Sequence, residues 1–368
     1  MRLGIDARLP YYQMGGISQY VVHLLAALAA LDSQNDYVVA QRRGDTRTYA
    51  PAQANFRRVD VRTPCHHRWE RWALSAELLP LRLDSWHSPD FIPPQRGARR
   101  HVITVHDLNF LTYPHYLTAD SRRYYNDQIA WAVQRADAIA ADSEYTRQEL
   151  IDRLGVAPAK VRAIPLAANA VYQQAVSAET TRQLLAQHQL PPGFILFVGT
   201  LEPRKNLPTL LEAYHRLRQT GAIDDVPLVL VGRRGWLWEG IFEHIARLGL
   251  TEQVRHLSGI DDLSLAHLYH AAGVLALPSH YEGFGLPPLE AMHCGCPVVC
   301  SRRASLPEVV GEAGVLLEPD AVDEWAEALR RVLGDSAWRA ELRQRGYAQA
   351  QRFTWERTAR LTWELYQC

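Results

Sequence analysis

The segment Glu282-Gly-Phe-Gly-Leu-Pro-Pro-Leu-Glu290 places two carboxylates eight positions apart around a glycine-rich turn. Its Pro-Pro pair predicts the start of a helix, because proline suits the first helical turn, where backbone N–H groups have no partner. Glu282 should then lie in a loop at a strand end, and Glu290 on the helix. The free N–H groups of Gly285 and Leu286 would bind phosphate, and the carboxylate beside them would accept sugar hydroxyls. The pattern therefore predicts a nucleotide-sugar site.

A second segment with chemical potential is Gly199-Thr-Leu-Glu-Pro-Arg-Lys-Asn206, between a predicted strand and a predicted helix. Adjacent cations at a strand end suit a pyrophosphate, which gathers negative charge as a leaving group departs. Lys205 is informative here, because the chain otherwise uses arginine almost throughout. The alternative interpretation of Arg204 and Lys205 is a solvated loop at the end of a strand.

The first half of the chain offers two weaker candidates. Gly15-Gly16 follows the first predicted strand and allows a ligand to approach the backbone closely, although an ordinary turn has the same pattern. It is not G-x-G-x-x-G, so a dinucleotide site is poorly supported. His106 directly follows a predicted strand and can hydrogen-bond a sugar hydroxyl or polarise a reaction centre. A structural hydrogen-bonding role for His106 is an equal alternative.

Composition limits the class of protein. The chain has 368 residues, enough for two domains, and 47% of them are hydrophobic. The formal net charge of zero gives no signal for nucleic acid or another polyanion. Five cysteines without a fourth ligand at metal spacing predict no zinc site and favour a reducing, cytoplasmic location. The start of the chain reads as a strand, and no apolar run is long enough to span a bilayer.

The order of the elements predicts an α/β protein with two similar domains. Apolar strands alternate with amphipathic helices, which implies parallel sheets covered on both faces. The expected strands are 3–6, 37–40, 85–87, 101–105, 138–141, 194–198, 228–231, 254–257, 274–277 and 298–300. The expected helices are 17–31, 68–79, 119–134, 145–154, 207–218, 239–248, 263–272, 321–333 and 337–366. The polar, proline-containing stretch 165–192 is predicted to be a linker, and the default ligand site is a cleft between the domains.

These motifs together resemble retaining GT-B glycosyltransferases of family 4. The resemblance is strongest over 277–292 and 199–206, and it is looser in the first domain. There Gly4-Ile-Asp-Ala-Arg8, Gly15-Gly16, His87-Ser-Pro89 and Thr104-Val-His-Asp-Leu108 are similar to mannosyltransferase-like members. It implies two Rossmann-like domains facing across a cleft: an acceptor-side domain over 1–170 and a donor domain over 190–352. A final helix over 353–368 is expected to cross back onto the first domain.

The resemblance also implies a role for each matching residue. Glu290 would bind the nucleotide ribose, and Glu282 the hydroxyls of the donor sugar. The backbone of Phe284, Gly285 and Leu286 would bracket the sugar and the distal phosphate. Arg204 and Lys205 would hold the pyrophosphate. Gly15 and Gly16 would let the first-domain loop approach the donor, and His106 would lie near the transferred sugar.

The sequence predicts a reaction but leaves alternatives for the donor, for the function and for the role of helix 68–79. No D-x-D triplet is present, so metal-independent transfer is expected. The resemblance implies retention of configuration, and the mannosyltransferase-like first domain implies transfer of mannose from GDP-mannose to a glycan or lipid-linked glycan. A UDP-sugar such as UDP-glucose is the alternative donor. A nucleotide-sugar epimerase, a phosphorylase or a non-catalytic binding protein on the same fold is the alternative function. The Trp- and Arg-containing helix 68–79 is expected either to pack in the core or to contact the inner membrane surface.

Overall fold

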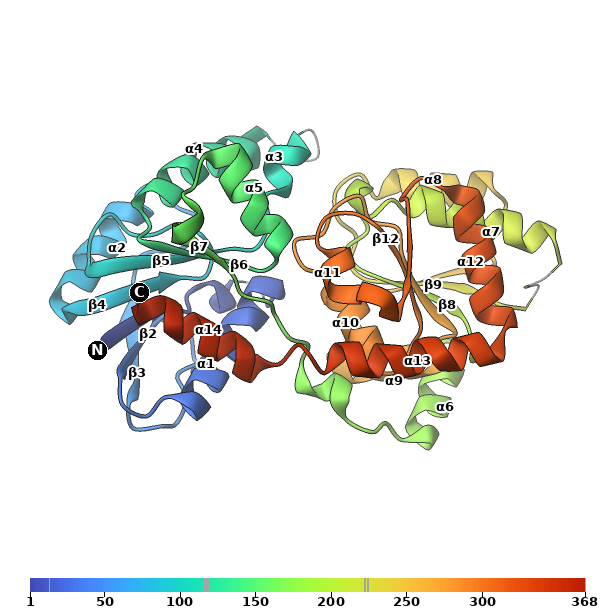
Figure 1. The fold of residues 1–368 in the computed structure, drawn as a ribbon, viewed down its shortest axis with the longest axis horizontal. Helices are drawn as coiled ribbons and strands as arrows, with labels where there is room; N and C mark the ends of the chain where they lie inside the picture. Colours follow the sequence, from blue (N-terminus) through green and yellow to red (C-terminus); the bar gives the residue numbers. More distant parts are fainter. Residues whose placement is uncertain (13, 115–118, 222, 224, 368) are drawn as a thin grey trace. The chain divides into compact units, whose positions relative to one another are not determined.

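The computed structural model describes residues 1–12, 14–114, 119–221, 223 and 225–367. Within this part the chain forms two compact units, shown in Figure 1. Unit 1 comprises Met1–Leu166 together with Thr354–Cys368, and unit 2 comprises Ala167–Phe353. Each unit contains one sheet in which every recorded strand pair is parallel.

Unit 1 is built on a seven-stranded sheet in the order β3-β2-β1-β4-β5-β6-β7. Its strands are β1 (Arg2–Asp6), β2 (Asp36–Arg42), β3 (Phe56–Val61), β4 (Leu83–Ser88), β5 (Ala98–Val105), β6 (Ala138–Ala141) and β7 (Val161–Ala163). Its helices are α1 (Gly16–Leu31), α2 (Glu70–Leu78), α3 (Asn109–Thr112), α4 (Ala119–Arg135), α5 (Glu144–Leu154) and α14 (Trp355–Gln367). The order reverses between β1 and β4, which makes that strand pair the topological switch point of the sheet.

Both faces of the unit 1 sheet are covered, as the alternation of side chains along a strand requires. On β2, Val38 and Ala40 pack with Leu74 and Leu78 of α2. Tyr37, the neighbour of Val38, donates its hydroxyl instead to Asp32 at the end of α1, at 2.7 Å. The expected helices and strands of this domain form, with boundaries shifted by one to three residues.

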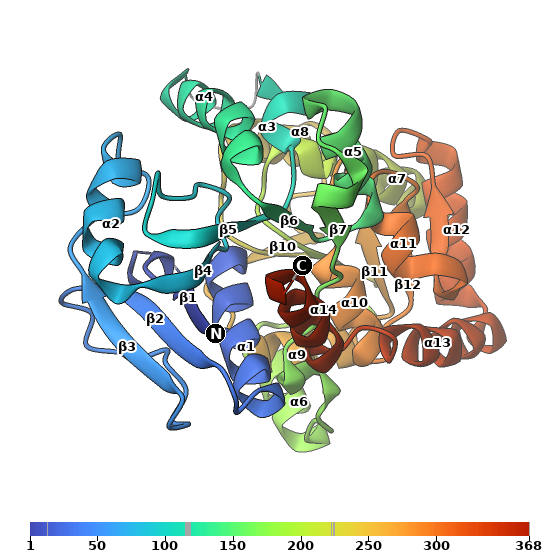
Figure 2. The same ribbon diagram turned by 60° about the vertical axis from the view of Figure 1, so that its left-hand side comes forward.

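The last helix, α14, belongs to unit 1, and Figures 1 and 2 both show it beside α1. Trp363 donates its indole N–H to Asp32 at 3.0 Å, and Thr358 donates to the Pro165 carbonyl at 2.7 Å. His87, inside the sheet, bonds Tyr366 through Nδ1 and Thr104 through Nε2, both at 2.7 Å. Burial lowers the pKa of His87 to about 3, so a neutral ring joins the last helix to the sheet.

Unit 2 repeats the design with a six-stranded sheet in the order β10-β9-β8-β11-β12-β13. Its strands are β8 (Ile195–Val198), β9 (Leu228–Val231), β10 (Val254–Leu257), β11 (Val274–Leu277), β12 (Val298–Ser301) and β13 (Val315–Leu317). Its helices are α6 (Ala178–Gln187), α7 (Leu207–Gln219), α8 (Glu239–Arg247), α9 (Asp262–Ala271), α10 (Leu286–His293), α11 (Leu306–Val310), α12 (Val322–Gly334) and α13 (Ser336–Ala350). The switch point of this sheet lies between β8 and β11.

Three predictions about elements were wrong. The stretch 165–192 is not simply a linker: it contains α6, whose N-cap Ser177 accepts a hydrogen bond from Thr180 N–H at 3.3 Å. The single helix expected over 337–366 is two helices, because α13 ends at Ala350 and α14 begins at Trp355. Three strands were missed: β3, β7 and β13 are edge strands whose residues are partly exposed. β3 and β7 contain charged residues, and β13 is apolar but only three residues long.

Candidate functional site

The carboxylate of Glu282 is the centre of a buried charge cluster at the switch point of unit 2. It lies in the loop after β11 and is 6% exposed. Lys205, in the loop after β8, donates to its Oε1 at 2.6 Å, and Arg204 donates to its Oε2 at 3.0 Å. Ser279 also donates to Oε1, at 2.6 Å. The two predicted motifs, 77 residues apart, therefore meet in one site.

Electrostatics keep this carboxylate ionised. Burial alone would raise the pKa of Glu282, but Lys205 and Arg204 together with the hydrogen bonds lower it to about 2. For Lys205, burial and the neighbouring Arg204 lower the pKa from its ordinary value. Glu202 is a fourth charged member: its carboxylate accepts from Arg204 Nε at 2.6 Å and is also buried. Two cations thus balance two carboxylates before any ligand binds.

The cluster keeps hydrogen-bonding capacity for a ligand. A carboxylate has about four lone-pair positions, and the recorded bonds to Glu282 use three of them. One position on Oε2 is left for a hydroxyl group. Lys205 makes one recorded hydrogen bond within the described part of the chain, so its Nζ retains donors that can point at an anion.

The glycine-rich turn presents backbone N–H groups beside the same carboxylate. Gly285 has φ of 111°, a left-handed conformation that favours glycine, and α10 begins at the next residue. Pro287 and Pro288 occupy its first turn as the sequence predicts. Neither Phe284 nor Gly285 donates its N–H to any described residue. The helix start is therefore available to phosphate, as helix N-termini generally are.

A serine fixes the shape of this turn. Ser305 is completely buried and its hydroxyl lies 2.8 Å from the Glu282 carbonyl oxygen and 2.6 Å from that of Phe284. Because the carbonyls point at Ser305, the N–H groups of the turn point away from it. The sequence did not single out Ser305, which has no motif of its own.

Glu290 lies on α10, within two turns of its start. Its Oε2 accepts a hydrogen bond from the hydroxyl of Tyr269 on α9, at 2.9 Å. Although part of its surface is exposed, burial of the carboxylate raises the pKa of Glu290 to about 7, against the lowering effect of the Tyr269 bond. Tyr269 is 0% exposed and was missed by sequence reasoning, because an aromatic residue on an apolar helix face predicts only core packing.

In unit 1, His106 lies directly after β5, with both ring nitrogens bonded inside the protein. Nδ1 bonds Asp142 Oδ2 at 2.7 Å, and Nε2 donates to the Pro89 carbonyl at 2.8 Å. Burial would lower the pKa of His106, but Asp142 raises it to about 9, so the ring is an imidazolium at neutral pH. The geometry favours the structural alternative: His106 connects the loops after β4, β5 and β6.

Gly15 and Gly16 also lie in unit 1, where Gly15 is the N-cap of α1. A Cβ atom placed on Gly16 would have no heavy atom within 4 Å, so the fold itself does not require a glycine there. Asp142 directly precedes the N-cap of α5 and bonds His106. Ser143 caps α5 by accepting from Thr146 N–H at 3.1 Å.

Three further observations concern metal ligands, cysteines and membrane-spanning helices in the described part of the chain. No group of three or more His, Cys, Asp or Glu side chains in that part of the chain is arranged to hold a metal ion. Cys65, Cys294, Cys296 and Cys300 are free thiols. None of the described helices combines the length and apolar character needed to cross a membrane.

Two units, each built on a parallel sheet with a switch point, form the α/β architecture of the GT-B glycosyltransferases. Comparison with known families agrees. The family described as "Glycosyl transferases group 1" matches residues 183–351, and "Glycosyltransferase Family 4" matches residues 14–170. The chain belongs to the family 4-like GT-B glycosyltransferases and is an enzyme of that class.

Individual relatives support the assignment. The chain is 37% identical over 302 residues to the O-antigen chain mannosyltransferase B of Escherichia coli, covering 82% of this chain and 77% of the relative. It is 32% identical to a D-inositol 3-phosphate glycosyltransferase of Salinispora tropica, over 64% of this chain and 51% of that protein. The structure of sucrose-phosphate synthase from Thermosynechococcus elongatus superposes with a TM-score of 0.78 at 24% identity, covering 100% of this chain and 98% of that one.

The His106–Asp142 pair predicts a defined pH dependence of stability. The folded pKa of His106 lies above its unfolded value of about 6.5, so its stabilising contribution is complete below pH 6.5 and is lost as pH rises through about 9. Between pH 7 and 9 the free energy of unfolding should fall by up to about 1.4 kcal/mol per pH unit from this residue. Asp142→Asn should lower stability at pH 7 and flatten that slope.

Urea unfolding at pH 7, 8 and 9 measures this effect. Asp84→Asn is the control, because Asp84 is another carboxylate of unit 1 that accepts a hydrogen bond, from the Arg2 backbone N–H at 2.8 Å, but bonds no histidine in the described structure. An unchanged slope in Asp142→Asn would show that His106 is not the residue that titrates.

Proposed function

We propose that this glycosyltransferase transfers mannose from GDP-mannose, with retention of configuration, to a hydroxyl of a glycan acceptor in the synthesis of a cell-surface polysaccharide or glycolipid. The observation that carries the proposal is the 37% identity to an O-antigen chain mannosyltransferase across most of both chains. The buried site at the switch point of unit 2 supplies the chemistry that such a donor needs.

Each group in that site has a proposed role. The ribose hydroxyls donate to Glu290, and a hydroxyl of the donor sugar donates to the remaining lone pair of Glu282. The diphosphate accepts hydrogen bonds from Lys205 and from the N–H groups of Phe284, Gly285 and Leu286. Because Glu282 and Glu202 already balance Arg204 and Lys205, the phosphate binds a neutral cluster supported by a helix start.

The proposed reaction proceeds on one face of the sugar. The bond between the anomeric carbon and the phosphate oxygen breaks, and the acceptor oxygen bonds the anomeric carbon. The acceptor proton passes to an oxygen of the departing diphosphate, which requires a separation of about 3 Å between these oxygens. Lys205, Arg204 and the helix start stabilise the negative charge on the leaving group. No resident metal ion takes part in this scheme. In unit 1, Gly15 and Gly16 are proposed to leave room for a ligand at the start of α1, and His106 to hold the loops after β4, β5 and β6.

The experiment that tests the function compares donors directly. Titration calorimetry should show tighter binding of GDP than of UDP, and incubation with GDP-mannose and a mannoside acceptor should yield an α-linked product by NMR. Tighter binding of UDP would replace the donor with a UDP-sugar such as UDP-glucose. Conversion of the donor without any acceptor would indicate an epimerase, release of a sugar phosphate on adding inorganic phosphate would indicate a phosphorylase, and binding without turnover would indicate a nucleotide-sugar binding protein.

The contact between Tyr269 and Glu290 gives a sharper test of the ribose site. Tyr269→Phe removes the hydroxyl that holds the Glu290 carboxylate, so GDP should bind about five- to tenfold more weakly, the effect of one hydrogen bond to a charged group. The affinity for 2′,3′-dideoxy-GDP should not change, because that ligand has no ribose hydroxyls to offer.

Tyr214→Phe provides the control. Tyr214 is as buried as Tyr269, and its hydroxyl donates to the Val226 carbonyl at 2.7 Å, on α7 and away from the proposed site. Tyr214→Phe should lower the free energy of unfolding by a similar amount but leave the affinity for GDP unchanged. If Tyr269→Phe weakened both nucleotides equally, the ribose assignment of Glu290 would be incorrect.

We also infer that unit 1 contacts an anionic membrane surface through the start of α2. Trp69 and Trp72 are 55% and 54% exposed with ring centroids 5.8 Å apart, and the exposed Arg68 lies over the Trp69 ring. Aromatic and basic residues together favour the lipid headgroup region. The protein should float with vesicles containing phosphatidylglycerol at low salt, and Trp69→Ser/Trp72→Ser should not.

Trp236→Ser is the matched control for flotation, since Trp236 is 42% exposed but lies in unit 2. Absence of wild-type protein from the floating fraction would leave α2 as an ordinary surface helix.

A further inference from the structure

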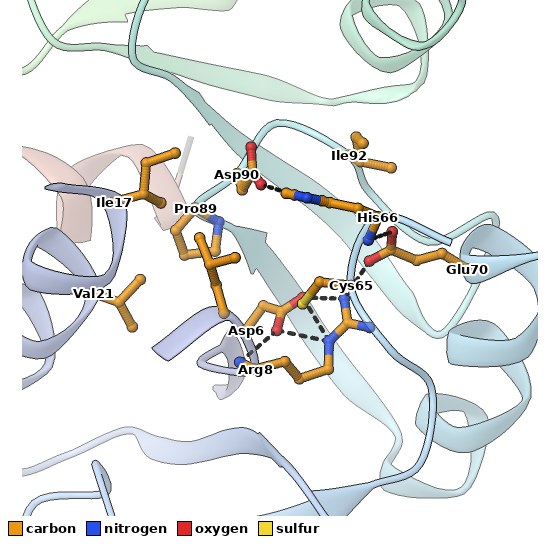
Figure 3. A pocket seen from close by; sticks show the side chains of 11 residues that line it. Asp6, Arg8, Ile17, Val21, Cys65, His66, Glu70, Pro89, Asp90 and Ile92 are labelled. Carbon is orange, nitrogen blue, oxygen red and sulfur yellow. Dashed lines mark hydrogen bonds and ion pairs between the residues drawn. The ribbon is translucent and has the colours of Figure 1, made fainter. Parts of the chain in front are cut away.

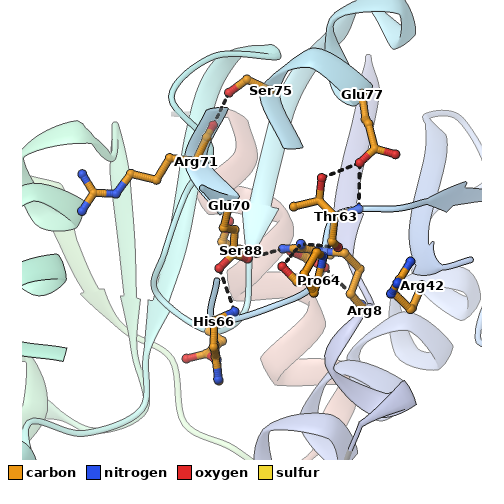
Figure 4. A network of polar contacts seen from close by, with 12 residues as sticks. Arg8, Arg42, Thr63, Pro64, His66, Glu70, Arg71, Ser75, Glu77 and Ser88 are labelled. Carbon is orange, nitrogen blue, oxygen red and sulfur yellow. Dashed lines mark hydrogen bonds and ion pairs between the residues drawn. The ribbon is translucent and has the colours of Figure 1, made fainter. Parts of the chain in front are cut away.

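Carboxylates below the surface of this protein differ in whether a cation neutralises them. In unit 1, Asp6 and Glu70 each accept a hydrogen bond of 2.6 Å from the Arg8 guanidinium, as Figure 3 shows. Figure 4 shows the same guanidinium beside its further acceptors, the carbonyls of Thr63 and Pro64. The carboxylates around the diphosphate site of unit 2 are neutralised in the same way, by the neighbouring lysine and arginine.

Glu290, the proposed ribose ligand, has no such cation. Its one recorded hydrogen bond within the described chain comes from the neutral hydroxyl of Tyr269, at 2.9 Å. Asp262, the first residue of α9, is bonded in a similar way. Its Oδ2 accepts from the Asn169 side chain at 3.1 Å, and its Oδ1 from the Tyr172 hydroxyl at 3.3 Å. All three donors are uncharged, so these hydrogen bonds leave both carboxylates without a counter-charge.

Helix geometry brings the two carboxylates towards each other. Asp262 and Tyr269 are seven positions apart on α9, which places them on one face of the helix. A long helical side chain leans towards the N-terminus of its helix, so the Tyr269 hydroxyl, with the Glu290 carboxylate that it bonds, extends towards Asp262. The ring of Tyr172 completes the cluster, because it packs edge to face with Tyr269, at 5.8 Å between centroids, while its hydroxyl bonds Asp262.

The segment that begins unit 2 fixes the position of Asp262. Asn169 is the N-cap of the turn Ala170–Gln173, and this role orients the side-chain amide that donates to Asp262. Tyr172 is 2% exposed, and its carbonyl accepts a hydrogen bond from the thiol of Cys294, at the end of α10. The segment is therefore bonded to both helices of the ribose site, and it holds the Asp262 carboxylate in place.

Asp262 is the one charged side chain recorded against Glu290 in the described structure. The other titratable groups are Tyr269, Tyr172 and Cys294. Burial raises the pKa of each of these three groups, so all of them are neutral at pH 7. Burial also raises the pKa of Glu290 to about 7, and the charge of Asp262 adds to this effect against the Tyr269 hydrogen bond. Without a ligand, about half of the Glu290 carboxyl groups carry a proton at pH 7.

We propose that Asp262 is a positioning residue of the donor site, whose charge, held beside Glu290 by Asn169 and Tyr172, makes nucleotide binding release a proton. The proposal rests on the ribose role of Glu290 proposed above and deepens it. Ribose hydroxyls donate their hydrogens to the ionised carboxylate, so the proton on Glu290 passes to the solvent as they bind. The affinity for the nucleotide therefore falls as the pH is lowered through 7.

Calorimetry of the wild-type protein tests the proton release. GDP-mannose is the probe, because its diphosphate is esterified at both ends and has no group that titrates near pH 7. Its affinity should rise about tenfold from pH 6 to pH 8. The heats of binding at pH 7 in Tris and in phosphate should differ by an amount that corresponds to the release of about half a proton. Equal heats in the two buffers, with an affinity that does not change with pH, overturn the proposal.

Asp262→Asn then tests the residue. The variant keeps a similar shape but removes the charge, so the affinity for GDP-mannose at pH 6 should increase, and the rise from pH 6 to pH 8 should shrink to about threefold or less. A merely structural role would instead lower the affinity by the same factor at every pH. An unchanged tenfold rise in Asp262→Asn would also overturn the proposal.

Asp335→Asn is the matched control. Asp335 is another carboxylate at a helix start of unit 2, where it accepts from the Trp338 N–H at 2.9 Å, and it bonds no member of the cluster in the described structure. This variant should keep the pH dependence of the wild-type protein. Melting temperatures check that both variants fold; if Asp262→Asn does not, the proton count of the wild-type protein still decides.

Failure of this proposal is distinguishable from failure of the proposed function. Binding of GDP-mannose without release of a proton would reject the role of Asp262 but keep the transferase. If UDP-glucose binds and GDP-mannose does not, the same titrations use UDP-glucose, which carries the same ribose hydroxyls. Absence of binding by both nucleotide-sugars across pH 6 to 8 would reject the function itself.

Discussion

The site in unit 2 depends on one buried interaction, the ion pairs of the Glu282 carboxylate with Lys205 and Arg204. These cations arrive from the loop after β8 and the carboxylate from the loop after β11, which are neighbours only because the strand order reverses there. Leaving one of these charges buried without a partner would cost several kcal/mol. Separating the two loops is therefore strongly unfavourable. The ion pairs therefore hold both loops in place, and the helix start that follows Glu282 is held with them.

The switch point of unit 1 also joins loops that are distant in the sequence. At its centre, Arg8 pairs with Asp6, at the end of β1, and with Glu70, at the start of α2. In unit 2 cations and carboxylates balance, and Lys205 keeps donors for an anion.

Many of the strands and helices could be predicted from the sequence, and the reasons can be identified. Apolar strands such as 228–231 are buried on both faces, so their pattern is unambiguous, and the Pro-Pro pair marks the start of α10. Edge strands such as β3 alternate charged and apolar residues and were missed. The stretch holding α6 was misread because its helix is mostly exposed, with Leu185 as its one buried residue. Polarity there reflects a surface helix rather than an absence of structure.

The residues of the site show more clearly what the sequence alone cannot predict. Glu282, Lys205 and Glu290 were identifiable because each lies in a motif with its own local signal. Tyr269 and Glu70 have none, since their partners are 21 and 62 residues away. His106 shows the same limit for chemistry: its place after β5 suggested a group facing substrate, and only the contacts to Asp142 and Pro89 reveal a fixed cation. A position at a strand end predicts where a side chain lies. The protonation of that side chain and the donors or acceptors it has left are set by neighbours from other loops.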